Sequence, residues 1–310
     1  MRAQTATAVR LRAVSVDTRL ADRLGPGLVS VGSVHSIHDR AVNVRTADGL
    51  LCCLATGDLE DAPRTVRIDA DSWATARWDV GAPVDVDLTG ATGWLPSPAD
   101  LSGLTPSGLL RAAAAIDRQL PRPAGRTDFE RASADLLGRR TTQLAAALQA
   151  QDAAATTRTA EALVGLGAGL TPSGDDVLTG LLVLAAAEGM RLASARPALR
   201  AAVADRLEAR TTAVSAAMLT EAADGRARQR LHDLVAAIAA DSADGDLATA
   251  IRRVREIGHS SGADVLAGMR LGLTVESLLR SSTTGHRPRR TPSPDWSPTS
   301  TDPHPQERET

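Results

Sequence analysis

The sequence of 310 residues contains no lysine and no tyrosine, and its aromatic residues are four Trp and one Phe. The absence of lysine excludes a Schiff-base lysine, a lysine general base and the lysine of a P-loop. With so few aromatic rings and a net charge of −2, the chain has neither the stacking platform nor the basic field that nucleic-acid binding needs. Acid–base chemistry is therefore left to Asp, Glu, His and Cys.

Cysteine and long apolar runs are also scarce. Cys52 and Cys53 are adjacent, and neighbours on a strand point to opposite faces, so we predict two reduced thiols of a cytosolic protein. The longest apolar stretch, residues 177–187, is interrupted by Thr179 and Gly180 and is too short to span a bilayer. The sequence does not begin with a signal-type apolar run, so we expect a cytoplasmic protein that does not bind a membrane.

The residue pattern changes near residue 100. Before this point, short segments such as 84–88 alternate between apolar and polar side chains and are separated by Gly, Asp and Pro, which is typical of strands. After it, Ala, Leu and Arg recur at helical spacing. We therefore predict an α+β protein with a small antiparallel β domain at 1–100, a larger, mainly helical domain at 101–280 and a disordered tail at 281–310. The predicted helices cover 108–119, 127–150, 152–165, 173–190, 197–224, 227–240, 245–257 and 262–280.

A glycine-rich segment at 165–176 reads Gly-Leu-Gly-Ala-Gly-Leu-Thr-Pro-Ser-Gly-Asp-Asp. It lies between two predicted helices, and Ser173 with Asp176 three residues later resembles a capping box. Glycines permit positive φ, and the exposed N–H groups of such a turn bind anions. The segment is neither a P-loop nor a dinucleotide-binding turn, because acidic residues and Pro172 occupy the positions that define those motifs. The alternative is a capped helix behind a glycine-rich linker.

The start of this second helix recurs 88 residues later. Ser-Gly-Asp-Asp-Val-Leu-Thr-Gly at 173–180 is matched by Ser-Gly-Ala-Asp-Val-Leu-Ala-Gly at 261–268. One explanation is that two helix N-termini meet across a pseudo-twofold axis, so that Asp176 and Asp264 flank a polar cleft. The alternative is coincidence between two well-capped helices.

Histidines and hydroxyl groups add candidates near these helix starts. His259 immediately precedes the second copy, beside a glycine, and is well placed for proton transfer. Thr211, Thr212 and Ser215 fall inside the predicted helix at 197–224. Thr211 either bonds the carbonyl four residues before it or, with Ser215, lines the polar cleft.

In the β domain, His35 and His38 stand three residues apart, which does not place both on one strand face. No cysteine or carboxylate accompanies them at zinc-ligand spacing, so we expect no zinc site. Contact between His35 and the helical cleft is left open.

Three motifs together resemble the AllH-like family, which is associated with the AllH subunit of oxamate carbamoyltransferase in anaerobic allantoin breakdown. They are the glycine-rich segment at 165–176, Thr-Thr-x-x-Ser at 211–215 and Gly-His-Ser-Ser-Gly-Ala-Asp-Val-Leu-Ala-Gly at 258–268, and the resemblance extends over about residues 25–280. It implies transfer of a carbamoyl group between oxalurate and phosphate, giving oxamate and carbamoyl phosphate. It also implies a small anionic substrate and a complex with other subunits.

Set against this reaction, His259 is the candidate acid, with Asp176 and Asp264 as further catalytic residues. Candidate substrate-binding positions are Gly167, Gly169, Thr171, Ser173, Gly174, Asp175, Thr211, Thr212, Ser215, Ser260, Ser261 and Gly262. The aspartates either cap their helices, orient His259 or hold a divalent cation such as Mg²⁺, the one cofactor that we consider. Two other functions remain open: a non-catalytic subunit that binds an anionic metabolite, and a magnesium-dependent phosphoryl hydrolase that uses Asp175, Asp176 and Asp264.

Overall fold

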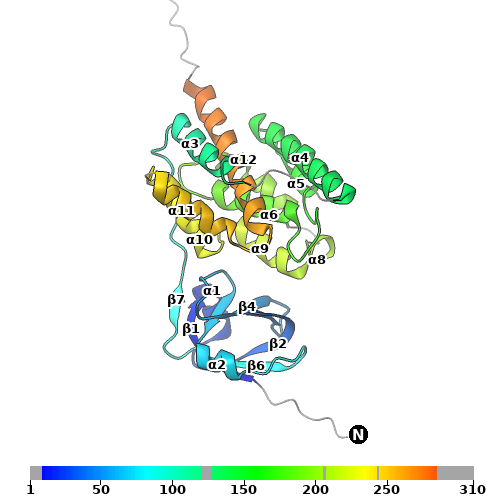
Figure 1. The fold of residues 1–310 in the computed structure, drawn as a ribbon, viewed down its shortest axis with the longest axis vertical. Helices are drawn as coiled ribbons and strands as arrows, with labels where there is room; N and C mark the ends of the chain where they lie inside the picture. Colours follow the sequence, from blue (N-terminus) through cyan, green and yellow to red (C-terminus); the bar gives the residue numbers. More distant parts are fainter. Residues whose placement is uncertain (1–8, 121–126, 205–206, 243, 285–310) are drawn as a thin grey trace, which may run out of the picture.

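The computed structural model describes residues 9–120, 127–204, 207–242 and 244–284. It consists of a strand-rich N-terminal unit and a larger helical unit, which lie one above the other in Figure 1. Strands occupy residues 9–94, and the helices of the second unit begin at residue 106. The predicted α+β class and the order of its two parts are therefore confirmed.

The N-terminal sheet curls into a barrel. Its strands are β1 (Val9–Asp17), β2 (Leu28–His38), β3 (Ala41–Arg45), β4 (Leu51–Thr56), β5 (Thr65–Ile68), β6 (Pro83–Asp87) and β7 (Thr92–Trp94). They pair in the order β5-β4-β3-β2-β6-β1-β7, and β5 also pairs with β1, which closes the barrel. Val42, Val66 and Val84 are fully buried inside it, so the apolar positions of the alternating segments form its core.

The pairing inside the barrel is mixed. Neighbours joined by short turns, such as β2, β3 and β4, are antiparallel as predicted. However, β1 is parallel to β6 and β7, and β4 is parallel to β5. Strands β1 and β6 are far apart in the sequence, whereas β4 and β5 are joined by residues 57–64 alone. Alternation along one segment marks a strand without indicating the direction of its partner. Two short helices, α1 (Thr18–Leu24) and α2 (Ala70–Thr75), lie in the connections.

The helical unit contains most of the predicted helices near their predicted bounds. They are α3 (Pro106–Asp117), α4 (Asp128–Gln149), α5 (Ala153–Glu161), α6 (Ser173–Ala185), α10 (Gln229–Ala239), α11 (Asp244–Arg255) and α12 (Ser261–Thr284). Because α12 continues to Thr284, the tail predicted from 281 begins too early, and the remainder of that tail lies outside the described residues. None of the described helices is long and apolar enough to cross a membrane.

The single long helix predicted at 197–224 is wrong. This part of the chain forms α7 (Arg196–Ala202), α8 (Leu207–Arg210) and α9 (Ala213–Ala223), and the short 3₁₀ helix η1 (Arg191–Ala195) precedes them. A new helix begins at Ala213 because the side chain of Thr212 caps it and accepts the N–H of Ser215 at 3.1 Å. The apolar spacing persists across the break, so periodicity alone did not reveal it.

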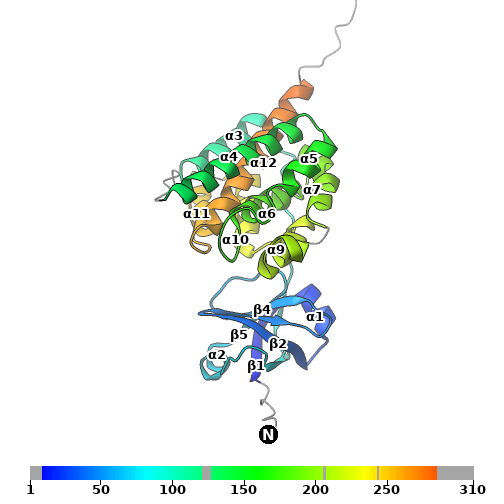
Figure 2. The same cartoon turned by 90° about the vertical axis from the view of Figure 1, so that its right-hand side faces the viewer.

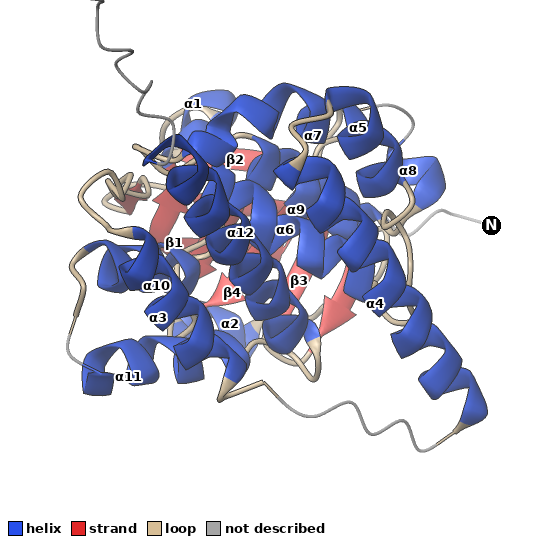
Figure 3. Ribbon diagram, turned by 90° about the horizontal axis from the view of Figure 1, so that it is seen from above, coloured by secondary structure: helices blue, strands red, loops and turns tan. Residues whose placement is uncertain are grey.

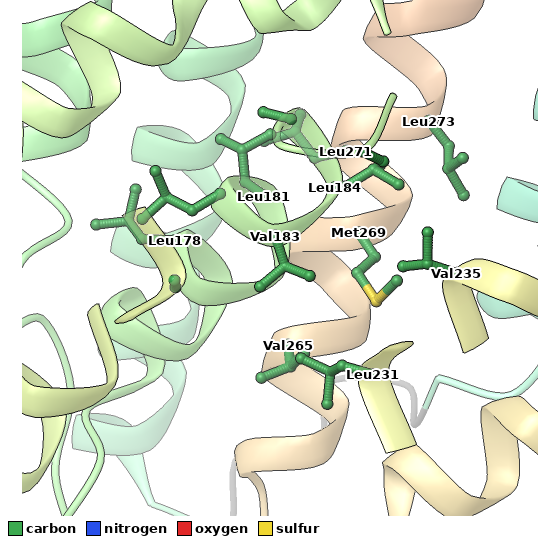
Figure 4. Packing of buried hydrophobic residues seen from close by; sticks show 14 of the residues in the cluster. Leu178, Leu181, Val183, Leu184, Leu231, Val235, Val265, Met269, Leu271 and Leu273 are labelled. Atoms are coloured by element: carbon green, nitrogen blue, oxygen red, sulfur yellow. The ribbon is translucent and has the colours of Figure 1, made fainter. Parts of the chain in front are cut away.

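Helix α6 lies at the centre of the helical unit, with other helices around it in Figures 2 and 3. Every residue from Gly174 to Ala185 is buried. Helix α12 packs along it, and Figure 4 shows Leu181 and Leu184 of α6 in one cluster with Met269 and Leu271 of α12. The core of the unit therefore centres on the two helices that carry the repeated motif.

The two helices touch through their glycines. A Cβ atom added at Gly180 would lie 2.1 Å from the carbonyl oxygen of Val265, and one added at Gly268 would lie 1.9 Å from that of Val177. Each helix thus touches the backbone of the other at its own glycine. The two glycines stand 88 residues apart in the sequence, and so do the two valines. The repeated segments therefore meet across a pseudo-twofold axis, as the first of the two explanations predicted.

We predict that Gly268→Ala destabilises the protein by about 3 kcal/mol or more, because its methyl group meets backbone that must move. The matched control is Gly138→Ala in α4, where nothing lies within 4 Å of the added Cβ and where alanine stabilises a helix by about 0.5–1 kcal/mol. Urea unfolding of both variants measures the difference. Equal stability of the two variants would contradict the close backbone contact.

Candidate functional site

The first turns of α6 and α12 face each other. The hydroxyl groups of Thr171 and Ser261 are hydrogen-bonded at 2.6 Å, and both lie close enough to Asp176 to lower its pKa. Burial raises the pKa of Asp264, and the hydroxyl of Ser173 opposes this rise in the same way. The first serine of each helix therefore faces the aspartate of the other helix.

The two serines are not the N-caps that the sequence had predicted. Helix α6 begins at Ser173 itself, its N-cap is Pro172, and no side chain caps it. Helix α12 begins at Ser261, and the carbonyl of the exposed Ser260 accepts the N–H of Asp264 at 3.1 Å. The serines are thus the first helical residues rather than N-caps, and tertiary contact replaces the local capping box.

Asp176 is the most unusual residue of this region. Its side chain is 1% exposed, and neither carboxylate oxygen has a hydrogen-bond partner among the described residues. Burial raises its pKa to about 7, and the negative charges of Asp264 and Asp175 contribute to the same shift. An unpaired buried carboxyl group costs stability, which makes Asp176 a candidate for binding or chemistry.

Asp175 has a different environment. Its Oδ1 accepts the N–H of Gly165 at 2.8 Å and its Oδ2 accepts the hydroxyl of Thr211. Burial nevertheless raises its pKa. The hydroxyl of Thr212 donates to the carbonyl of Leu170 at 2.6 Å. Asp175, Thr211 and Thr212 therefore hold the glycine-rich turn against the start of α9.

Ser215 lies in the first turn of α9, beside this group. It is 1% exposed, its hydroxyl has no hydrogen-bond partner among the described residues, and it lowers the pKa of Asp175. Thr211, Thr212 and Ser215 were predicted to lie inside one long helix. Instead, Thr211 and Thr212 precede α9, and Ser215 lies in its first turn.

The glycines of the turn serve conformation and packing. Gly167 and Gly169 have φ values of +119° and +103°. A Cβ at Gly174 would lie 2.0 Å from the carbonyl of Leu163, and the matching atom at Gly262 would lie 2.1 Å from that of Val254. The N–H of Gly174 donates to the carbonyl of Leu166 at 2.8 Å, so this donor is already used and is not free for an anion.

A cavity of about 270 Å³ lies between the barrel and the helices, and Asp176 and Ser261 face it. Thr179, one turn after Asp176, also lines it; its hydroxyl is buried without a hydrogen-bond partner among the described residues. The barrel contributes His38, Asn43, Cys52, Cys53, Arg64 and Thr65, and the helical side contributes Leu170, Val214, Met218, Glu221, Arg226, Arg228, Leu231, Ile257 and Val265. The repeated motif therefore opens onto an interdomain cavity.

The histidines are placed differently from the sequence expectations. His259 is exposed in the turn before α12 and is not among the residues that line the cavity. In the barrel, His38 rather than His35 lines it. Its Nε2 lies 3.4 Å from Ser36 Oγ and 3.4 Å from Asn43 Nδ2. A register shift in β2 between Val34 and Ser36 changes which side chains face inward after it.

Both cysteines are free, as predicted. Burial raises the pKa of Cys52 to about 12 and that of Cys53 to about 11. Since the thiolate is the reactive form, these thiols form part of the cavity wall rather than a nucleophile.

A buried ionic network joins the barrel to α9, and sequence reasoning missed it. Arg226 is 5% exposed; it pairs with Asp17 of β1 and, at 2.6 Å, with Glu221 of α9. Glu221 also pairs at 2.6 Å with the guanidinium of Arg64, and the backbone N–H of Arg64 donates to Asp17 Oδ2 at 2.8 Å. No local pattern marks these residues, because their partners are distant in sequence. The network closes one side of the cavity.

Magnesium binding stays a prediction. Within the described ranges, no group of three or more His, Cys, Asp and Glu side chains is arranged to hold a metal ion. The oxygens of Asp175 already accept hydrogen bonds from Gly165 and Thr211, which leaves Asp176 and Asp264 as the carboxylates that could contribute to a cation site.

The raised pKa of Asp176 predicts how stability depends on pH. The pKa of this carboxyl is 3.8 in an unperturbed chain and about 7 in the folded protein. Below about pH 4 both states are protonated, so the group has no effect; between pH 4 and 7 only the unfolded state releases its proton. Stability should therefore fall as the pH rises through this window, by up to about 4 kcal/mol above pH 7.

The isosteric variant Asp176→Asn should remove the part of this fall that Asp176 causes and be more stable than the parent protein at pH 8. The control is Asp87→Asn, which should keep the fall in stability between pH 4 and 7. Hydrogen bonds from Thr89 lower the pKa of the Asp87 carboxyl, so Asp87 does not cause that fall. Urea unfolding at a series of pH values gives both results. An Asp176→Asn variant that keeps the parent pH dependence would show that Asp176 is ionised at neutral pH.

Two family models match the chain. One, described as oxamate carbamoyltransferase subunit AllH, matches residues 163–273, which run from the glycine-rich turn into α12. The other, described as the AllH family N-terminal domain, matches residues 12–93, which form the barrel. No solved structure matches the chain. Because the two matches together span more than half of the sequence, in the order of its two units, the chain belongs to the AllH family.

Proposed function

We propose that this chain is a catalytic subunit of a carbamoyltransferase and that the cavity between barrel and helices binds the carbamoyl-bearing substrate. The family description supports the reaction. The observation that carries the site is the buried carboxyl of Asp176, unpartnered within the described structure, at the wall of that cavity. In the proposed reaction the C–N bond of oxalurate breaks, an oxygen of phosphate bonds to the carbamoyl carbon, and the nitrogen of oxamate gains a proton.

The chemistry assigns a role to each part of the cavity. Asp176 accepts a hydrogen bond from the carbamoyl –NH₂ group, which supplies the partner that this carboxyl lacks. Arg64 and Arg228, which also line the cavity, suit a carboxylate or phosphate, since guanidinium binds both in bidentate fashion. The N-termini of α6 and α12 place partial positive charge where the attacked carbonyl develops negative charge.

Asp176 is also our candidate for the proton donor. A carboxyl group with a pKa near 7 holds a proton at neutral pH and can release it to a leaving nitrogen. His259 is exposed in the turn before α12, so a catalytic role for it requires contact with another subunit. Such a complex is implied by the word subunit in the family description.

A second candidate is a substrate-binding subunit without chemistry of its own. The exposure of His259 favours it, because the cavity would then lack the imidazole that sequence reasoning assigned as the acid. In this case the reacting groups belong to a partner. A magnesium-dependent hydrolase has less support, because Asp175 is engaged within the turn.

Turnover in a complex reconstituted with its partner subunits tests the proposal. With oxalurate and phosphate, Asp176→Asn should lower kcat by roughly 100-fold or more, the usual contribution of a general acid. Asp264→Asn makes the same change across the pseudo-twofold axis, at a residue that does not line the cavity, and should lower kcat much less. Formation of carbamoyl phosphate is the measurement.

The two candidates give different results in this experiment. A drop in kcat for Asp176→Asn with little change in KM supports catalysis by this chain. A change in KM alone supports the binding subunit. Full activity of Asp176→Asn would show that the cavity is not the site.

A further inference from the structure

The interdomain cavity is large for the substrate that the family description names. Its volume of about 270 Å³ approaches the range of roughly 300–1,000 Å³ that holds drug-sized ligands. Oxamate, the small monoamide of oxalate, would fill only a part of it. Space beside a bound amide must be occupied by water or by a larger substrate.

The polar end of the cavity has donors and acceptors that suit a carbamoyl group. Asp176 and Thr179 are one helical turn apart, so their side chains lie on the same face of α6. Both are at least 97% buried and neither has a hydrogen-bond partner within the described structure. The carboxyl accepts N–H groups and the hydroxyl donates to a carbonyl, which matches the –NH₂ and C=O of –CO–NH₂.

The rest of the wall is mostly apolar. It includes Val214 and Met218 of α9, Leu231 of α10 and Val265 of α12. Water against such a surface is unfavourable, whereas an aliphatic side group of a ligand would be buried there. This wall has no function in binding oxamate alone.

Cations complete the lining. Arg64 pairs through Nε with Glu221, and Nη1 of Arg228 lies 3.5 Å from Glu60. A guanidinium group carries five N–H donors, so each arginine has further donors to offer a carboxylate. The side chain of Arg228 is 43% exposed, which places a cation where the cavity meets solvent.

We infer that the cavity binds an N-carbamoyl carboxylate that carries an apolar side group. The carbamoyl end lies against Asp176 and Thr179, the side group against the wall formed by α9 and α10, and the carboxylate toward Arg64 and Arg228. This inference rests on the proposed function, because it takes the carbamoyl group from it and names the class of substrate.

Calorimetric titration of the full chain tests the inference with N-carbamoyl-leucine, N-carbamoylglycine, N-acetyl-leucine and oxamate. N-acetyl-leucine replaces the –NH₂ group of N-carbamoyl-leucine by methyl and is otherwise the same molecule. We expect N-carbamoyl-leucine to bind roughly tenfold tighter than N-acetyl-leucine, the value of a hydrogen bond to a buried carboxyl. It should also bind roughly tenfold tighter than N-carbamoylglycine, which lacks the apolar side group.

Variants separate the two ends of the cavity. Asp176→Asn should reduce the preference for the carbamoyl over the acetyl compound and keep the preference for leucine over glycine. Met218→Ala should reduce the preference for leucine over glycine and keep the preference for the carbamoyl over the acetyl compound. Asp87→Asn on the barrel surface should leave both preferences unchanged. Thermal unfolding of each variant without ligand shows that it is folded.

Several outcomes would overturn the inference. They are tighter binding of oxamate than of N-carbamoyl-leucine, equal binding of all four compounds, and absence of binding. Carbamoyl transfer from oxalurate in the reconstituted complex, without a preference for N-carbamoyl-leucine, would refute this inference and leave the proposed function intact. The preference without any carbamoyl transfer would refute the proposed function and leave the binding inference intact.

Discussion

The close contact between α6 and α12 is the constraint on which the site depends. Gly180 and Gly268 let each helix approach the backbone of the other at Val265 and Val177. Side chains of any size at these positions would separate the helices. Because the glycines stand seven residues after the first serine of each helix, the same contact also brings the two N-termini together.

The meeting of the N-termini explains how the carboxyl group of Asp176 can be buried without a hydrogen-bond partner among the residues that the structure describes. Each N-terminus carries partial positive charge, which offsets part of the cost of placing Asp176 and Asp264 close together. The cost that remains appears as the raised pKa of Asp176. A protein that retains such a group gives up stability where an uncharged residue would be more favourable.

The barrel makes this polar spot part of a cavity wall. The ion pairs of Arg226 with Asp17 and Glu221 are almost fully buried, so breaking one would leave an uncompensated charge, which is strongly unfavourable. They fix the barrel against α9, and Trp94 adds a hydrogen bond from its Nε1 to Gln229 at 2.7 Å. Without the barrel, Asp176 and Thr179 would face solvent and have no reason to remain unpartnered.

Local pattern was sufficient for much of the fold. Alternation revealed the strands, helical spacing revealed most of the helices, and the repeat at 173–180 and 261–268 offered the pairing of α6 with α12 as one of two explanations. Local pattern failed at 197–224, where a Thr cap interrupts an apolar stripe that continues beyond it, and at the parallel strand pairs, since alternation along a strand does not give the direction of its partner.

The sequence by itself determined the two-part α+β organisation and pointed to the similar helix starts at 173–180 and 261–268, because both follow from neighbouring residues or from a near-identical repeat. Only the tertiary structure decided that Ser173 and Ser261 face across the axis, that His38 and not His35 reaches the cavity, that His259 stays exposed and that Arg226 joins the two units. The reason is physical: burial, pKa and charge pairing depend on groups brought together from distant parts of the chain, and no spacing along the chain encodes them.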